Sequence, residues 1–217
     1  MRSWSGVYVV LAGPDGSGKS TLASRLAAAA RRSGRPARHL HWRPGLLPQA
    51  GSLVGRAPGD PSTPHAEEPQ GRVLSLLRLV YYWADFLLGT WLRVQPITAR
   101  GGLVVMERGW WDIAVDPRRY RLRVGARVIR ALGRLLPAPD LVLVLRASPE
   151  ILAQRKEELP TSELARQNDR WDEIRFPQRI AKIVLDATRS QDDLVADAAA
   201  HMATVSGGDP VGAGGVE

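Results

Sequence analysis

A glycine-rich segment near the amino terminus holds the residue types that bind a polyphosphate. Residues 13–21 read Gly-Pro-Asp-Gly-Ser-Gly-Lys-Ser-Thr and satisfy the pattern G-x-x-x-x-G-K-[ST]. Glycines in such a loop let backbone N–H groups converge on phosphate oxygens, while the lysine bridges the outer phosphates and the next hydroxyl ligates Mg²⁺. We therefore expect ATP and Mg²⁺ as cofactors. The expected ATP-binding residues in this segment are Gly13, Asp15, Gly16, Ser17, Gly18, Lys19, Ser20 and Thr21.

A carboxylate and an arginine, Glu107 and Arg108, directly follow the apolar run Leu103–Met106. In an open parallel sheet the carboxyl ends of the strands line the ligand crevice. Glu107 would then organise the ligand shell of Mg²⁺ together with Ser20, and Arg108 would hold a second anion. The alternative is an ion pair that merely solvates the end of a strand.

An arginine-bearing segment over residues 150–172 has the composition of a lid. It contains Arg155, followed by Arg166 and Arg170, which are four residues apart and so share one face of a short helix. Phosphoryl transfer spreads negative charge over the moving group, and a mobile lid with arginines neutralises that charge while it excludes water. Charge runs of this kind also occur on ordinary solvated helix faces. The expected catalytic residues are Lys19, Arg108, Arg155, Arg166 and Arg170.

Short apolar runs separated by helical patterns predict a doubly wound α/β sheet with helices on both faces, and the glycine loop makes it a P-loop NTPase fold. The five expected parallel strands are Val7–Ala12, Ala37–Trp42, Leu103–Met106, Leu141–Leu145 and Ile183–Leu185. The expected helices are Lys19–Arg32, Leu74–Val94, Arg127–Leu136, Pro149–Glu158 and Gln191–Ala203. We expect one domain over residues 1–205, with a flexible loop at 44–70 and a disordered tail at 206–217.

The expected helix Leu74–Val94 is apolar on most of its circumference, so we expect it to be buried. Arg78, Tyr82, Asp85 and Gly89 recur along it at helical spacing and form a polar stripe. Unpaired buried charge is costly. Either these polar groups pair with neighbours for structural reasons, or the stripe faces a ligand.

Two further segments follow the Glu-Arg pair. Residues 110–121 contain two tryptophans and two carboxylates, and Asp112 among them could shape an acceptor site. Arg127, Arg130 and Arg134 then share one face of an amphipathic helix, which could touch nucleic acid or an anionic membrane. A solvated outer face is the alternative, and this helix alone does not predict either partner.

The composition is that of a globular intracellular protein. Hydrophobic residues make up 44% and charged residues 24% of the 217 residues, which excludes a disordered chain. The absence of cysteine excludes disulfides, thiolate nucleophiles and zinc ribbons, and four scattered histidines do not suggest a metal cage. The net charge of +8 comes largely from arginine, so an anionic partner is permitted. No targeting or membrane-spanning segment is evident, and we expect a cytoplasmic location.

The order of these motifs resembles the thymidylate kinase family of nucleoside monophosphate kinases. The glycine loop, the Glu-Arg pair, the lid segment and Leu185-Asp186-Ala187-Thr188 follow the family's order over roughly residues 7–200. By this resemblance Asp15 contacts the acceptor sugar, Arg108 holds the acceptor phosphate, and the lid arginines serve the transferring group. Arg189, in the loop after the last strand, would lie beside the adenine of ATP.

The chain departs from the family's pattern in three places. Glu107 stands where the family has Asp, and residues 42–45 read Trp-Arg-Pro-Gly where the family has Arg-Glu-Pro-Gly. The long helix has Phe86 in place of the family's base-reading arginine, and losing a charged donor removes a contact that discriminates strongly. Thymidylate itself is therefore uncertain as the acceptor. The expected acceptor-binding residues are Asp15, Arg43, Arg78, Tyr82, Asp85, Phe86, Arg108 and Asp112.

The sequence thus predicts phosphoryl transfer from ATP to a small phosphorylated acceptor, a nucleoside monophosphate, with Ser20 and Glu107 at the metal. One alternative is a kinase of the same fold with a non-nucleotide acceptor such as a sugar phosphate. A second alternative is a nucleotide-dependent switch that binds nucleic acid through its basic helix. A homodimer also stays open.

Overall fold

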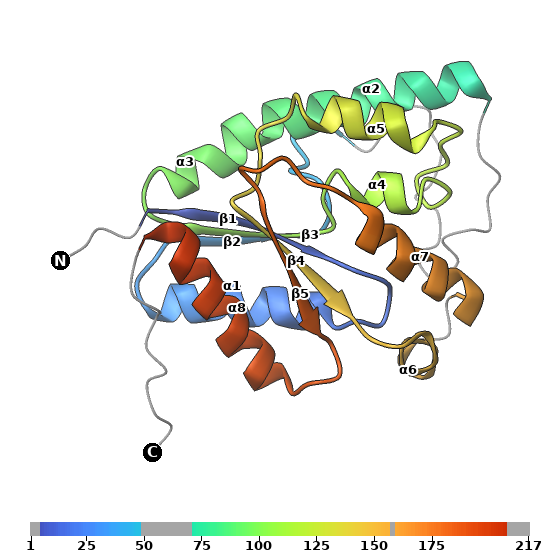
Figure 1. Ribbon diagram of the computed structural model, residues 1–217. Helices are drawn as coiled ribbons and strands as arrows, with labels where there is room; N and C mark the ends of the chain where they lie inside the picture. The colour runs from blue at the N-terminus through green and yellow to red at the C-terminus, as the bar shows by residue number, and fades with distance from the viewer. Residues whose placement is uncertain (1–4, 49–70, 157–158, 208–217) are drawn as a thin grey trace.

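The computed structural model describes residues 5–48, 71–156 and 159–207. Five parallel strands form one sheet in the order β2-β3-β1-β4-β5 (Figure 1). The strands are β1 Val7–Ala12, β2 Ala37–Leu40, β3 Leu103–Glu107, β4 Leu141–Arg146 and β5 Ala181–Asp186. The predicted α/β class and the five parallel strands are confirmed.

Helices connect the strands and cover the sheet on both faces. They are α1 Lys19–Arg32, α2 Arg72–Gly89, the π-helical turn η2 Thr90–Val94, α3 Gln95–Thr98, α4 Asp112–Val115, α5 Ala126–Gly133, α6 Pro149–Arg155, α7 Thr161–Glu173 and α8 Gln191–Ser206. Sequence analysis did not find α4, and it foresaw α7 only as a short helix of unstated length. The helix α2 continues through η2 into α3 without a break.

Two buried clusters lie on opposite faces of the sheet. In β1 the even-numbered side chains join one cluster with residues of α2, α4 and α5, and the odd-numbered ones join the other with residues of α1 and α8. Figure 1 shows α2 and α5 above the sheet and α1 and α8 below it. Because both faces are covered, every residue of β1 is buried, as its continuous apolar run predicts.

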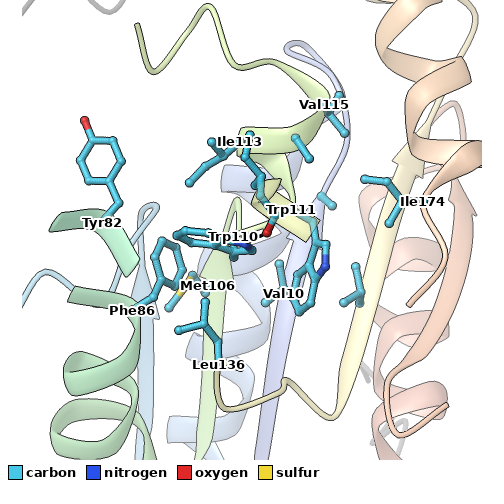
Figure 2. Packing of buried hydrophobic residues seen from close by; sticks show 14 of the residues in the cluster. Val10, Tyr82, Phe86, Met106, Trp110, Trp111, Ile113, Val115, Leu136 and Ile174 are labelled. Carbon is cyan, nitrogen blue, oxygen red and sulfur yellow. Dashed lines mark hydrogen bonds between the residues drawn. The ribbon is translucent and has the colours of Figure 1, made fainter. Parts of the chain in front are cut away.

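Aromatic side chains fix the turn that follows β3. Trp110 packs edge-on against Phe86 of α2, with ring centroids 5.6 Å apart, and its Nε1–H donates to the carbonyl of Ile129 at 2.7 Å (Figure 2). The neighbouring Trp111 packs against Phe176 on the other side. Phe86 is therefore a core residue. Arg108, which immediately precedes this turn, is held in place by it.

The expectation that the long helix is buried is confirmed for only one of its faces. One face of α2 and η2 packs on the sheet, through Leu79 and Tyr82 among others, but its opposite face is exposed. The exposed apolar residues on this helix are Val73, Leu74, Leu76, Leu77, Val80, Leu88, Trp91 and Leu92. By length and composition alone, Arg72–Thr98 could cross a membrane, with a mean hydropathy of 1.2. An apolar composition does not determine how many faces of a helix find a partner.

Several predicted boundaries differ from the structure. The strand expected over 37–42 ends at Leu40, because Trp42 has a φ of +120°, which an extended strand does not contain. The fifth strand is longer than predicted, and α8 extends to Ser206, so the expected tail begins too early. The helices expected over 127–136 and 149–158 end at Gly133 and Arg155. Most of the expected loop 44–70, residues 157–158 and the tail from 208 onward lie outside the described residues.

Candidate functional site

Several predicted site residues, among them Asp15, Lys19 and Arg108, gather where the sheet changes winding direction. The neighbouring strands β1 and β3 are followed by α1 and α4, which belong to clusters on opposite faces of the sheet. The connections after these two strands therefore diverge beyond their carboxyl ends, which is the usual ligand position in open α/β sheets. Leu11 and Glu107 are register partners at this edge.

The loop between β1 and α1 has a backbone that its glycines permit. Gly13, Gly16 and Gly18 all have positive φ, at 126°, 78° and 86°. At Gly13 a Cβ would also lie 2.3 Å from the carbonyl oxygen of Leu145, so no other residue fits. A backbone of this kind can point several N–H groups at one anion.

The side chain of Lys19 folds back and contacts this loop. It is 5% exposed, and its Nζ donates to the carbonyl of Pro14 at 2.5 Å and to Ser17 Oγ at 3.1 Å. Burial and the nearby Arg108 lower its pKa to about 7, against the attraction of Asp15. Among the described residues no carboxylate forms an ion pair with Lys19, and an ammonium group held here has the chemistry to bind a polyphosphate.

Ser20 and Glu107 make a direct hydrogen bond. The Ser20 hydroxyl donates to Glu107 Oε2 at 2.5 Å, and His39 Nε2 lies 2.5 Å from the other carboxylate oxygen. Burial raises the pKa of Glu107, but hydrogen bonds from Ser20 and His39 outweigh it and keep the pKa below its usual range. A hydroxyl and an ionised carboxylate are oxygen donors that fit Mg²⁺, which retains several waters and takes few protein ligands.

His39 and the more exposed His41, whose Nδ1 lies 3.4 Å from Glu107, were not predicted at this site. Their spacing of two on the expected strand places them on one side of the sheet, which was an available signal. In the part of the chain that the structure describes, no group of three or more His, Asp or Glu residues has metal-binding geometry.

Five residues form what we call the charge cluster: Asp15, Lys19, Arg108, Asp112 and Arg119. Asp15 accepts hydrogen bonds from Arg108 through one carboxylate oxygen and from Arg119, at 2.5 Å, through the other. Asp112 lies 3.9 Å from Arg108 and also accepts from the backbone N–H of Gly109 at 2.7 Å. Sequence analysis did not find Arg119, since several arginines surround it in the chain and only the fold selects one.

Burial and neighbouring charges shift the pKa values in this cluster. Burial raises the pKa of Asp15, but Arg108, Lys19 and Arg119 outweigh it and hold that pKa well below its usual range. Burial raises the pKa of Asp112 to about 6. For Arg108, the carboxylate of Asp15 outweighs burial and raises the pKa. Three cationic side chains thus lie among Asp15, Asp112 and the nearby buried Asp116, whose charge also acts on Arg108. Guanidinium and ammonium groups gathered in one buried place can bind an anionic ligand.

The predicted lid arginines lie around this cluster without contacting it. Arg155 donates to the carbonyl of Ala187 at 2.8 Å, and Arg166 forms a two-pronged ion pair with Glu163, with its Nε at 2.7 Å. Arg170 donates to the carbonyl of Val115, the last residue of α4, at 2.7 Å. The helix α7 therefore rests on the segment that follows the charge cluster. Arg189 pairs instead with Asp193 and Asp197 of α8 at the surface.

Asp85 fastens the loop after β2 to α2. It is fully buried, pairs with Arg43 at 3.0 Å, and accepts from the backbone N–H groups of Gly45 at 3.1 Å and Leu47 at 2.6 Å. At Gly89 a Cβ would lie 2.5 Å from Pro44, so α2 and this loop approach closely. Of the two alternatives for the polar stripe, the structure thus gives Asp85 a structural pairing. The other stripe residues are Arg78, which is half-buried, and Tyr82, which is buried.

A cavity of about 770 Å³ lies elsewhere, at the opposite end of the strands. It is lined by residues near the amino ends of β1 and β4, such as Gly6 and Asp140, and by the end of α3, with Arg100 beyond it. No predicted site residue lines it. The charge cluster, which holds the chemically reactive groups, is the better candidate site.

A comparison with protein-family models found no match, and a comparison with curated proteins found none either. The resemblance to the thymidylate kinase family stays a prediction from the motifs.

Proposed function

We propose that this chain is a P-loop kinase that transfers the γ-phosphoryl group of ATP, with Mg²⁺, to a nucleoside monophosphate. The observation that carries the proposal is the shared carboxylate of Asp15, which links the glycine loop to two arginines, Arg108 and Arg119. This contact supports the proposal, because it holds the glycine loop directly beside the two arginines. A kinase with a phosphorylated acceptor needs two such groups side by side.

The glycine loop would hold the donor. Its N–H groups and Lys19 would bind the β- and γ-phosphates, as the positive-φ glycines and the buried Nζ permit. Ser20 and Glu107 would hold the Mg²⁺ ion and its waters. The ion supplies neutralisation of the charge that develops on the phosphate oxygens.

Arg108 and Arg119 would hold the acceptor phosphate. Asp15 keeps the two guanidiniums in place, and an incoming phosphate dianion would find donors from both. One oxygen of that phosphate forms a bond to the γ-phosphorus, the bond from the γ-phosphorus to the bridging oxygen breaks, and ADP keeps the electron pair. Because the attacking oxygen is already anionic, positioning and charge neutralisation suffice without a strong base.

The arginines of α6 and α7 would complete the site on closure. Arg155, Arg166 and Arg170 lie on helices that pack on one another, and α7 also contacts α4. Their present partners are carbonyl groups and one carboxylate, which a small movement of the helices would exchange for phosphate oxygens. We propose that residues 150–172 are the lid.

A non-nucleotide acceptor is a second candidate, because Phe86 lies in the core and offers no polar contact to a base. One experiment separates the two. Purified protein with ATP and Mg²⁺ is assayed for ADP release against nucleoside monophosphates and sugar phosphates, with Lys19→Ala as the inactive control. Acceptor-dependent ADP release from a mononucleotide supports the proposal. Release only with sugar phosphates supports the alternative, and no acceptor-dependent release with any of them contradicts both.

A further inference from the structure

Two aromatic rings lie against each other beside the charge cluster. Trp42 follows β2 and Tyr120 follows α4, and their rings stack with centroids 4.9 Å apart and planes inclined by 27°. Tyr82 of α2 packs edge-on against the same tryptophan, with centroids 5.0 Å apart. Tyr120 directly follows Arg119, which pairs with Asp15, and the charges of Asp112, Arg108, Arg119 and Asp116 all act on the Tyr120 hydroxyl. The stack therefore lies next to Arg108 and Arg119, the arginines proposed to bind the acceptor phosphate.

The stack leaves two polar atoms without partners among the described residues. Tyr120 is 6% exposed, and both its hydroxyl and the Nε1–H of Trp42 are buried with no hydrogen bond. Buried donors in native proteins are almost always paired, so two unpaired ones in a single contact need an explanation. A ligand that displaces one ring would relieve both.

The backbone at Trp42 is strained as well. Its φ of +120° is a value that side chains other than glycine rarely adopt. The loop just beyond is fastened by Asp85, through Arg43 and the N–H groups of Gly45 and Leu47. The fastened loop thus holds the Trp42 ring on Tyr120 in a conformation that its own backbone disfavours. Strain of this kind is concentrated at functional sites.

We propose that Tyr120 is the stacking platform for the base of a nucleoside monophosphate, and that Trp42 occupies the place of that base in the free protein. This inference rests on the proposed function, because it takes Arg108 and Arg119 as the phosphate grip. A nucleoside monophosphate carries a flat ring one ribose away from its phosphate, which matches a ring platform next to two arginines. A sugar phosphate has no flat ring to exchange for that of tryptophan.

The exchange accounts for each observation. When a base replaces the Trp42 ring on Tyr120, the stack is kept, the tryptophan Nε1–H reaches water and the strained backbone is free to relax. The Tyr120 hydroxyl, no longer covered by the tryptophan ring, also reaches water. Competition with Trp42 also lowers the apparent affinity, since only the displaced state binds.

The test is equilibrium binding by calorimetry, in the presence of Mg²⁺ and a non-hydrolysable ATP analogue. The probes are the four nucleoside monophosphates and ribose 5-phosphate, which has the phosphate and sugar but no base. Tyr120→Leu, which fills the site without a flat ring, should weaken mononucleotide binding by about tenfold to a hundredfold, the usual effect of losing one base stack. Its binding of ribose 5-phosphate should stay within about twofold.

Trp42→Gly gives a second, opposite expectation. Glycine accepts the φ of +120° and removes the competing ring, so mononucleotide binding should become about threefold to tenfold tighter. Trp91→Ala, an exposed tryptophan on η2, is the matched control and should bind as the wild type does. Unchanged mononucleotide binding in both Tyr120→Leu and Trp42→Gly overturns the inference.

The outcomes separate this inference from the proposed function. If the protein transfers phosphate but the Tyr120 and Trp42 variants bind mononucleotides as the wild type does, the proposed kinase activity is supported and the stacking platform is contradicted. Mononucleotide binding with the expected variant pattern, but no ADP release from ATP, leaves the platform standing and removes the kinase. The melting temperatures of both variants should lie above the assay temperature, which shows that weaker binding does not come from unfolding. Tyr120→Phe, which keeps the ring, should retain most of the binding.

Discussion

The Ser20 hydroxyl donates to the carboxylate of Glu107 at 2.5 Å, although 87 residues separate them in the chain. This bond joins the start of α1 to the end of β3. It brings together the two oxygen donors that the proposed metal site requires, and it connects them through Glu107 to His39.

Glu107→Gln should raise the Mg²⁺ concentration needed for half-maximal turnover. Glutamine keeps the shape and can still accept from Ser20, but it removes the negative charge that the ion requires. We expect at least a tenfold increase, since each tenfold corresponds to about 1.4 kcal/mol of lost interaction. Turnover is measured as a function of Mg²⁺ at saturating ATP, with a thermal melt to verify the fold. An unchanged Mg²⁺ requirement would remove Glu107 from the metal site.

Arg119→Ala should weaken binding of the acceptor more than binding of ATP. A hydrogen bond to a charged group contributes about 1.5–3 kcal/mol, so the acceptor KM should rise by roughly tenfold to a hundredfold. The KM for ATP should change by less than about threefold, because Lys19 and the loop are intact. The neighbouring Arg118, whose side chain is exposed, provides the control Arg118→Ala. Equal effects of the two substitutions on the acceptor KM would argue that net charge alone matters.

When a nucleotide binds above pH 7, the protein should take up a proton. In the free protein burial and Arg108 lower the pKa of Lys19 to about 7, so the amine is neutral at higher pH. A bound triphosphate favours the charged amine, and the affinity should therefore fall by about tenfold for each pH unit well above 7, and change little below it.

Calorimetry at pH 8 in buffers of different ionisation enthalpy measures this uptake directly. Lys19→Arg keeps its charge across the whole range and should abolish the proton uptake. Proton uptake near zero in the wild type at pH 8 would show that Lys19 is already charged before the nucleotide arrives.

The contacts of Asp85 with Arg43, Gly45 and Leu47 should stabilise the fold. Asp85→Ala leaves Arg43 without its carboxylate and two backbone N–H groups without an acceptor, so unfolding should become easier by about 3–5 kcal/mol. Asp172, which forms an exposed pair with Arg146, gives the control: Asp172→Ala should cost less than about 1 kcal/mol. Chemical denaturation of both variants checks this. If both substitutions lower the free energy of unfolding equally, the contacts of Asp85 contribute no more than a surface ion pair does.

Features that neighbouring residues determine were predictable from the sequence. The glycine spacing of residues 13–18 dictates the positive-φ loop, and continuous apolar runs such as Val7–Ala12 belong to strands covered on both faces. The position of Glu107 at a strand end follows from the run before it. The sheet class and the approach of Ser20 to Glu107 needed only these local signals and the rule for parallel sheets.

Features that depend on distant partners were not predictable. Nothing local distinguishes Arg119 from the arginines beside it, and only the fold brings it to Asp15. The partners of Asp85 are backbone N–H groups of a loop some forty residues earlier, which no side-chain pattern encodes. The open face of α2 was missed because an apolar stretch shows which residues avoid water, and not which of them find a neighbour.

The destination of the γ-phosphoryl group distinguishes a kinase from an ATPase. Phosphorus NMR of the protein with Mg²⁺, ATP and one equivalent of a nucleoside monophosphate follows every phosphate at once. The account predicts that the monophosphate signal gives way to a second diphosphate as ATP becomes ADP, with little free phosphate formed. Conversion of ATP to ADP and inorganic phosphate, with the monophosphate signal unchanged, would contradict it.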